Sequence, residues 1–280
     1  MIFSVAKADG TLEEFDVQKL RQSLLQSGAT AEEVAPIVSE IESIMYEGMQ
    51  TQEIYKHAFE LLQGSEVTVA ARYSLRRALF NLGPTGFPFE DFLARLFTYE
   101  GYTTKTRVIL QGNCAEHELD VAAYTEDHSF VVEAKFHSSP GMKSDLQVAL
   151  YCYARLLDLQ DTKVCNEAIC SIKELMIVTN TKFTSAAEKY ALCRGITLLS
   201  WEYPKGNNLH DRIQKTGLYP ITVLQTLSSS QKSALIEKGV VVCADLLQKP
   251  ELLRHAHINL ARTQLVLEEA KKLSVASVGI

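Results

Sequence analysis

The fold of this chain is decided by two short stretches, Glu118-Leu119-Asp120 and Val131-Val132-Glu133-Ala134-Lys135-Phe136. Read as adjacent strands, their side chains alternate between the two faces of a sheet. The apolar residues of the second stretch then share one face, whereas Glu133 and Lys135 fall on the other, roughly 6–7 Å apart. Asp120 on the first strand stands beside Glu133. Two carboxylates and an ammonium group that converge at a sheet edge can hold a hard divalent cation and a water molecule.

This arrangement resembles the PD-(D/E)XK nuclease superfamily, and within it the Mrr-like restriction endonucleases. The core of the match is Asp120 followed by Glu133-Ala134-Lys135. Phe89-Glu90-Asp91-Phe92 is similar to the opening helix of that family, and Gln147-Val-Ala-Leu-Tyr151 is similar to its QxxxY helix. Residues i and i+4 share a helical face, so Gln147 and Tyr151 are expected to point toward the same site.

The resemblance implies metal-dependent hydrolysis of a DNA phosphodiester. Asp120 and Glu133, with the Ala134 carbonyl, would bind Mg²⁺ or Mn²⁺, and Glu90 would complete the metal shell. Lys135 would orient the attacking water or stabilise the phosphorane, and Gln147 would position Lys135 or the scissile phosphate. A lone Glu-x-Lys is usually a solvated strand face, but the ordered set of four motifs favours the nuclease fold.

The first 82 residues resemble the ATP-cone, a nucleotide-sensing domain of ribonucleotide reductases. Asp9-Gly10 predicts a tight turn between strands at 1–5 and 11–15, and Asp16 then caps a helix. The resemblance implies that ATP or dATP acts as an effector here. The residues that it places at the nucleotide are Val5, Lys7, Glu13, Asp16, Lys19 and Thr51. Lysine side chains supply positive charge for phosphates. Without the surrounding pattern, these lysines would be interpreted as surface charges.

Composition describes an ordinary globular protein, with 46% hydrophobic residues and a net charge of −6. That charge argues against broad non-specific affinity for DNA but leaves room for a local basic groove. The six cysteines are scattered without a CxxC pair, which favours reduced thiols. No apolar run is long enough to span a bilayer and no signal peptide is recognisable, so a cytoplasmic protein without membrane contact is predicted.

We therefore predict a multidomain α/β protein with three parts. A small α+β ATP-cone occupies residues 1–82, and an α/β restriction-endonuclease-like sandwich occupies 83–210. A helical domain at 211–280 is similar to helix-hairpin-helix or SAM-like units. Gly83-Pro84-Thr85-Gly86 marks the first boundary. The expected helices include 31–46, 51–63, 66–81, 88–100, 142–158, 184–194 and 257–273, with strands near 105–111, 118–124, 129–137, 174–179 and 196–201.

The predicted function is that of a Mg²⁺-dependent DNA endonuclease, regulated by ATP or dATP at the cone and acting as a homo-oligomer. The alternative is a non-catalytic, nucleotide-responsive protein whose nuclease fold only binds nucleic acid or a partner. A metal-binding titration discriminates between the two, because a regulator has no need of an ion at Asp120 and Glu133.

Overall fold

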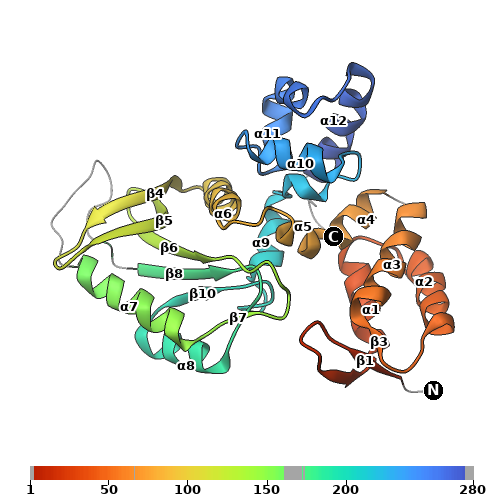
Figure 1. The fold of residues 1–280 in the computed structure, drawn as a ribbon, viewed down its shortest axis with the longest axis horizontal. Helices are drawn as coiled ribbons and strands as arrows, with labels where there is room; N and C mark the ends of the chain where they lie inside the picture. The colour runs from red at the N-terminus through yellow and green to blue at the C-terminus, as the bar shows by residue number, and fades with distance from the viewer. Residues whose placement is uncertain (1–2, 66, 161–171, 173, 275–280) are drawn as a thin grey trace.

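The computed structural model describes residues 3–65, 67–160, 172 and 174–274. Within these ranges the cone and a five-stranded sheet domain lie on either side of α5 and α9, and the C-terminal helices lie above them (Figure 1). Met1 and Ile2, expected in the first strand, and two of the cysteines, Cys165 and Cys170, lie outside the described residues.

The cone combines a small sheet with four helices. Its strands are β1 (Ser4–Ala6), β2 (Leu12–Glu14) and β3 (Met49–Gln50), in the order β2-β1-β3. The Asp9-Gly10 turn joins β1 to the antiparallel β2, and Gly10 takes the left-handed φ of +81° that such a turn requires. The helices are α1 (Val17–Gln26), α2 (Ala31–Ile44), α3 (Thr51–Ser65) and α4 (Val67–Tyr73).

The single helix expected over 66–81 is two helices in the structure, which corrects that prediction. After α4 the chain bends at Ser74, and α5 (Leu75–Phe80) follows. The hydroxyl of Ser74 donates to the carbonyl oxygen of Ala71 at 2.8 Å. A serine that bonds to the preceding turn competes with regular helix geometry and favours a bend.

The central domain is built on a mixed sheet in the order β10-β8-β6-β5-β4. Its strands are β4 (Thr103–Gln111), β5 (Glu116–Tyr124), β6 (Ser129–Lys135), β8 (Glu174–Thr179) and β10 (Thr197–Leu199). β5 is antiparallel to both of its neighbours, β4 and β6, whereas β6, β8 and β10 are parallel. A separate parallel ribbon joins β7 (Lys143–Ser144) to β9 (Lys182–Phe183), and neither of these strands was predicted.

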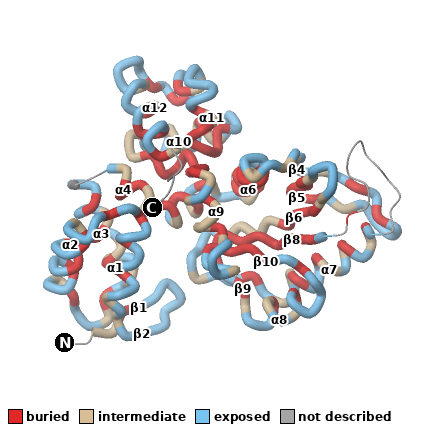
Figure 2. The backbone as a smooth tube through the Cα atoms, turned by 180° about the vertical axis from the view of Figure 1, so that it is seen from behind, coloured by how far each residue is buried: buried red, intermediate tan, exposed pale blue. Residues whose placement is uncertain are grey.

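Helices cover both faces of the central sheet, and successive side chains of β6 face opposite cores, as the predicted alternation requires. Phe130 and Val132 face the core that holds α6 (Phe87–Tyr99). Val131 faces the opposite core, which holds α7 (Leu146–Gln160) and α8 (Ser185–Arg194). Burial runs along β5, β6 and β8 in the middle of the sheet (Figure 2). Glu133 lies on the α7 side of this sheet, where only 3% of it is exposed.

The C-terminal part is helical, as predicted, and shares a core with its neighbours. It contains α9 (Leu209–Thr216), which runs across residue 210, then α10 (Ser229–Ile236), α11 (Cys243–Gln248) and α12 (Leu260–Ser274), with short 3-10 turns at Ile221–Val223 and Pro250–Ala256. Leu75 and Leu79 of α5 belong to the same apolar cluster as these helices and α6. The Thr222 hydroxyl also donates to the Ala78 carbonyl oxygen at 2.6 Å. The last helix of the first 82 residues is therefore part of the central core of the molecule.

Candidate active site

Asp120 lies where the antiparallel ladder of the sheet opens. Regular pairing of β5 with β6 ends at Val121 and Val132, so Asp120 and Glu133 follow as the next opposed pair without a ladder bond. The amide of Ala134 instead donates to Oδ2 of Asp120 at 2.6 Å. A side-chain carboxylate thus replaces the backbone partner that the separating strand no longer supplies.

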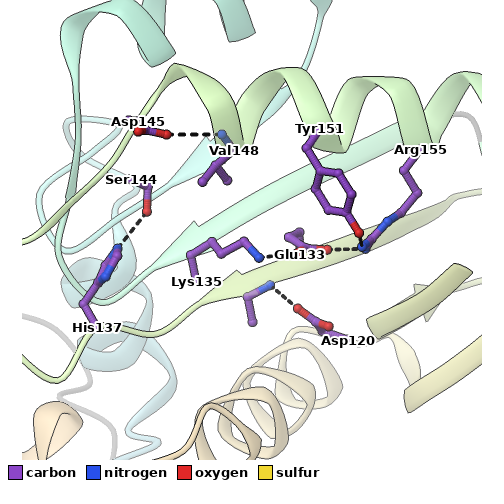
Figure 3. A network of polar contacts seen from close by, with 10 residues as sticks. Asp120, Glu133, Lys135, His137, Ser144, Asp145, Val148, Tyr151 and Arg155 are labelled. Atoms are coloured by element: carbon purple, nitrogen blue, oxygen red, sulfur yellow. Dashed lines mark hydrogen bonds and ion pairs between the residues drawn. The ribbon is translucent and has the colours of Figure 1, made fainter.

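Glu133 is held from two sides by positive charge (Figure 3). The Lys135 ammonium donates to its Oε1 at 2.5 Å, and Arg155 Nη1 donates to its Oε2. Because a buried carboxylate is costly unless it is paired, these two contacts explain how Glu133 is accommodated beside an apolar core.

Arg155 is the residue that sequence reasoning missed. It lies on α7, where its second terminal nitrogen donates to the hydroxyl of Tyr151 and its guanidinium lies 4.6 Å from the centre of the Tyr151 ring. The signal was present, because Gln147, Tyr151 and Arg155 follow one another at intervals of four residues and so share a helical face. The side chain of Gln147, one turn before Tyr151 on the same helix, is exposed.

Glu90 approaches the site from the first turn of α6. Phe89, its neighbour, packs against Phe136 at the end of β6, with ring centres 5.8 Å apart, which fixes α6 against the strand. Oε2 of Glu90 accepts from Arg107 Nη1 at 3.2 Å. Burial, followed by the charge of Asp120, raises the pKa of Glu90 above its ordinary value. Glu90, Asp120 and Glu133 therefore form a chain of interacting carboxylates.

The electrostatics of the site leave Asp120 short of positive charge. Burial and then the charge of Glu133 raise the pKa of Asp120 to about 6, against the smaller opposing effects of the Ala134 amide, Lys135 and Arg155. Burial disfavours the charged form of Lys135, but the hydrogen bond and charge of Glu133 outweigh it and raise the pKa of Lys135. The Lys135 ammonium is therefore charged at neutral pH, whereas the raised pKa of Asp120 reflects burial beside another carboxylate.

The side-chain donors at this site are carboxylate oxygens, the ligand type that a hard divalent cation such as Mg²⁺ takes. Among the residues that the structure describes, no three His, Cys, Asp or Glu side chains form a ready-made cage. Mg²⁺ does not need one, since it keeps several waters and is commonly held by one or two carboxylates together with a substrate phosphate. The N–H and C=O of a strand residue point to the same side. The Ala134 carbonyl therefore faces the same opening as Asp120.

Of the six residues expected at the nucleotide, two line a cavity and the other four lie elsewhere in the cone. Val5 is buried in the cone core, and the Asp16 carboxylate caps α1 by accepting from the amide of Gln18 at 2.9 Å. Lys19 is exposed on α1, and Glu13 forms an ion pair with Lys7. Lys7 and Thr51 line a cavity of about 380 Å³.

Comparison with known proteins identifies both ends of the chain. Residues 3–80 match the ATP cone domain, and residues 219–274 match the family described as AF1548-like, C-terminal. A protein of Archaeoglobus fulgidus, described as uncharacterized, is 37% identical over 182 residues, which are 65% of this chain and 99% of that protein. The crystal structure of the protein of unknown function AF1548 is similar with a TM-score of 0.56 and 36% identity, over 69% of this chain and all of that one. Both family matches lie outside the central sheet.

Proposed function

This chain belongs to the AF1548-like family, and from the geometry around Glu133 we propose that it is a metal-dependent phosphodiester hydrolase acting on DNA. The observation that carries the proposal is the convergence of Asp120, Glu133 and Lys135 at the edge where β5 separates from β6. The three-layer arrangement of helices around a mixed sheet supports the restriction-endonuclease-like assignment, and DNA is the substrate class that this resemblance implies.

Each residue has a separate task in the proposed reaction. Asp120 and Glu133, with the Ala134 carbonyl, would hold Mg²⁺ or Mn²⁺, an ion that polarises a phosphate and lowers the pKa of bound water. Lys135 donates hydrogen bonds to the attacking water or to the phosphate oxygens as negative charge accumulates there. Glu90, which is ion-paired with Arg107, would complete the metal shell.

Arg155 and Tyr151 position Glu133 rather than contact the substrate. The guanidinium fixes the carboxylate from the α7 side, and the Tyr151 ring and hydroxyl fix the guanidinium in turn. A carboxylate held in one orientation by neighbouring groups keeps its geometry when an ion binds.

The ATP cone adds a nucleotide-responsive element to this activity. The family match covers residues 3–80, and the motif residue Lys7 lines a cavity that is wide enough for phosphate groups. No G-x-x-x-x-G-K-[ST] loop occurs in the sequence, so the proposed role of ATP or dATP is that of an effector. Homo-oligomerisation, proposed with it, would bring two active sites together to cut both strands.

A second candidate is a regulator that binds nucleic acid or protein without cutting. One observation favours it: both oxygens of Glu133 are engaged in ion pairs, with Lys135 and Arg155. An ion would have to share Glu133 with these cations. A titration of the metal-free protein with Mn²⁺, followed by calorimetry, separates the two candidates, because the regulator has no use for the ion.

The direct test is cleavage of a plasmid and of an end-labelled duplex in Mg²⁺ or Mn²⁺. Asp120→Ala, Glu133→Ala and Lys135→Ala should each lower the rate at least about 100-fold, the usual loss when an acid–base or electrostatic group is removed. Glu118→Ala is the matched control, since Glu118 is an exposed carboxylate on the same strand as Asp120. Equal cleavage by wild-type and Lys135→Ala protein would show that the site is assigned wrongly.

A further inference from the structure

A cavity of about 380 Å³ lies between the cone and the sheet domain. On the cone side its wall contains Lys7 of the hairpin and Thr51 at the start of α3. Arg76 of α5, near the end of the matched cone residues, also lines the cavity. From the sheet domain, the wall is completed by the loop that follows β6 and by Lys182 of β9. The cavity therefore belongs to neither domain alone.

The charges on this wall are unbalanced. Lys7, Arg76, Lys143 and Lys182 all line the cavity, and Asp9 is the carboxylate among the lining residues that the structure describes. Two neighbouring carboxylates, Glu13 and Glu202, pair with Lys7 and Lys182 respectively, but neither belongs to the lining. The wall itself thus presents positive charge to whatever enters.

Two of these lysines are directly opposed on a two-stranded ribbon. Lys143 of β7 and Lys182 of β9 are register partners, and both face the cavity. Like charges directly opposite each other across a strand pair are destabilising. An anion between them would convert this repulsion into two favourable contacts.

Arg76 is only partly compensated. Its Nη1 pairs with Glu202 at 4.0 Å, but its Nε is buried and has no hydrogen-bond partner in the described part of the chain. Burial lowers the pKa of Arg76 in spite of Glu202. A buried donor that is left unpaired is costly, so this nitrogen indicates a missing acceptor.

We propose that the cavity binds the polyphosphate of a nucleoside triphosphate that the cone holds, and that Arg76, Lys143 and Lys182 contact its phosphates together with Lys7. The site thereby clamps the cone onto the sheet domain. This inference rests on the proposed function only in taking the nucleotide as the ligand of the cone, and it holds whether or not the chain cuts DNA.

One loop connects the cavity to the candidate active site. Gly141 lies beside the hairpin, where an added Cβ would be in van der Waals contact with Asp9 Cα at 3.5 Å and with the Ala8 carbonyl oxygen at 3.6 Å. The loop that contains Gly141 begins just after Lys135 and ends at α7. Anchoring Lys143 by phosphate therefore restrains the segment between the two elements that hold Glu133.

The test is calorimetric binding of ATP, adenosine and inorganic tripolyphosphate to the full chain at about 150 mM salt, a concentration that screens distant charges. Lys143→Ala and Lys182→Ala should each weaken ATP and tripolyphosphate about 10-fold, the usual loss for a hydrogen bond to a charged group. Adenosine should be unaffected by either change. Lys189→Ala, which removes an exposed lysine on α8 outside the cavity, should leave ATP affinity unchanged. Thermal melting of each variant checks that it is folded.

Three results would overturn the inference. Wild-type protein that binds no ATP is one, and unchanged ATP affinity in both lysine variants while Lys7→Ala loses affinity is another. The third is that the two lysine variants bind a fluorescent DNA duplex more weakly than the wild-type protein does but bind ATP equally well. That result would assign the cavity wall to DNA. Slower hydrogen exchange in the loop at 138–145 on addition of ATP, lost in Lys143→Ala, would support the clamp. A chain that shows these ATP effects but does not cut DNA would keep the clamp and reject the nuclease.

Discussion

Arg155 on α7 and Glu133 on β6 form an ion pair almost wholly shielded from solvent, with side chains 10% and 4% exposed. The pair joins the helix to the strand at the point where the candidate site opens. Glu133 is consequently a rigid carboxylate, and its position depends on a helix that the Glu-x-Lys motif alone does not include.

Removing Arg155 should destabilise the fold measurably. Arg155→Ala leaves a buried carboxylate with Lys135 as its remaining ion-pair partner among the described residues. Loss of one member of a buried pair typically costs about 3–5 kcal/mol, and we expect about 3 kcal/mol because Lys135 still compensates part of the charge. Urea unfolding at pH 7.5 measures the change in the free energy of unfolding.

A double-mutant cycle with Glu133→Gln supplies the control for this prediction. Arg155→Ala should cost less in the Glu133→Gln background, because a neutral amide no longer needs the guanidinium. Equal costs in the two backgrounds would mean that Arg155 stabilises the protein through packing on Tyr151 rather than through Glu133.

Asp120→Asn should stabilise the protein at pH 8 more than at pH 5. The folded-state pKa of about 6 lies above the ordinary value of 3.8, so the folded state takes up a proton more readily than the unfolded chain. The contribution of this group to stability is fully present below about pH 4 and is lost as the pH rises through 6. At pH 8 the penalty is at most about 3 kcal/mol, and solvent screening of this partly exposed side chain reduces it. Asparagine avoids the penalty.

Melting curves at the two pH values test this, with Glu118→Gln as the control on the same strand. Mg²⁺ at pH 8 should raise the melting temperature of the wild-type protein and not that of Asp120→Asn, because the ion would supply the missing positive charge. A stabilisation by Asp120→Asn that is independent of pH would show that Asp120 titrates normally.

Gln147→Ala should weaken cleavage less than Glu133→Ala does. The Gln147 side chain is exposed on α7, and its role is to support the site without carrying the charge of the ion. Rates measured under single-turnover conditions give the comparison, with Tyr151→Phe as the matched change one turn further along. A Gln147→Ala protein as inactive as Glu133→Ala would place Gln147 in direct contact with the metal or the phosphate.

ATP or dATP should change either the assembly or the cleavage rate of the wild-type protein. Effectors of this kind typically shift an equilibrium by about 1–3 kcal/mol, or roughly 5–150-fold. Sedimentation velocity and plasmid cleavage, each with and without nucleotide, measure the two effects. The Lys7→Ala/Lys19→Ala double variant should not respond. A nucleotide that binds tightly and alters neither property would leave the cone with a purely structural role.

The alternation of β6 was predictable because successive side chains of a strand must point to opposite faces of the sheet. Once Val132 faces a core, Glu133 must face the other way, and the structure places them so. The ATP cone was likewise recognisable from its local motifs, and the family match confirms it. Among the described residues, no helix is long and apolar enough to cross a membrane, while the cytoplasmic location stays a prediction. The domain boundaries and the roles of the site residues also stay predictions.

The unpredicted features depend on contacts between segments distant in sequence. β3, β7 and β9 are two residues long, too short for a periodic pattern, and each exists because a remote strand pairs with it. The opposition of Lys143 and Lys182 follows from such a pairing. Arg155 was missed for a different reason: an arginine on a helix is ordinarily solvated, and its burial depends on Glu133.

The shared core around α5 also has a consequence for synthesis of the chain. Ala78 leaves the ribosome 144 residues ahead of Thr222, whose hydroxyl donates a hydrogen bond to the carbonyl oxygen of Ala78. During that interval the apolar side of α5, with Leu75 and Leu79, cannot pack against the C-terminal helices, because these have not yet been synthesised. Transiently exposed apolar surface of this kind is where nascent chains aggregate or recruit chaperones. α5 is thus translated early but completes its packing only after the C-terminal helices have been made.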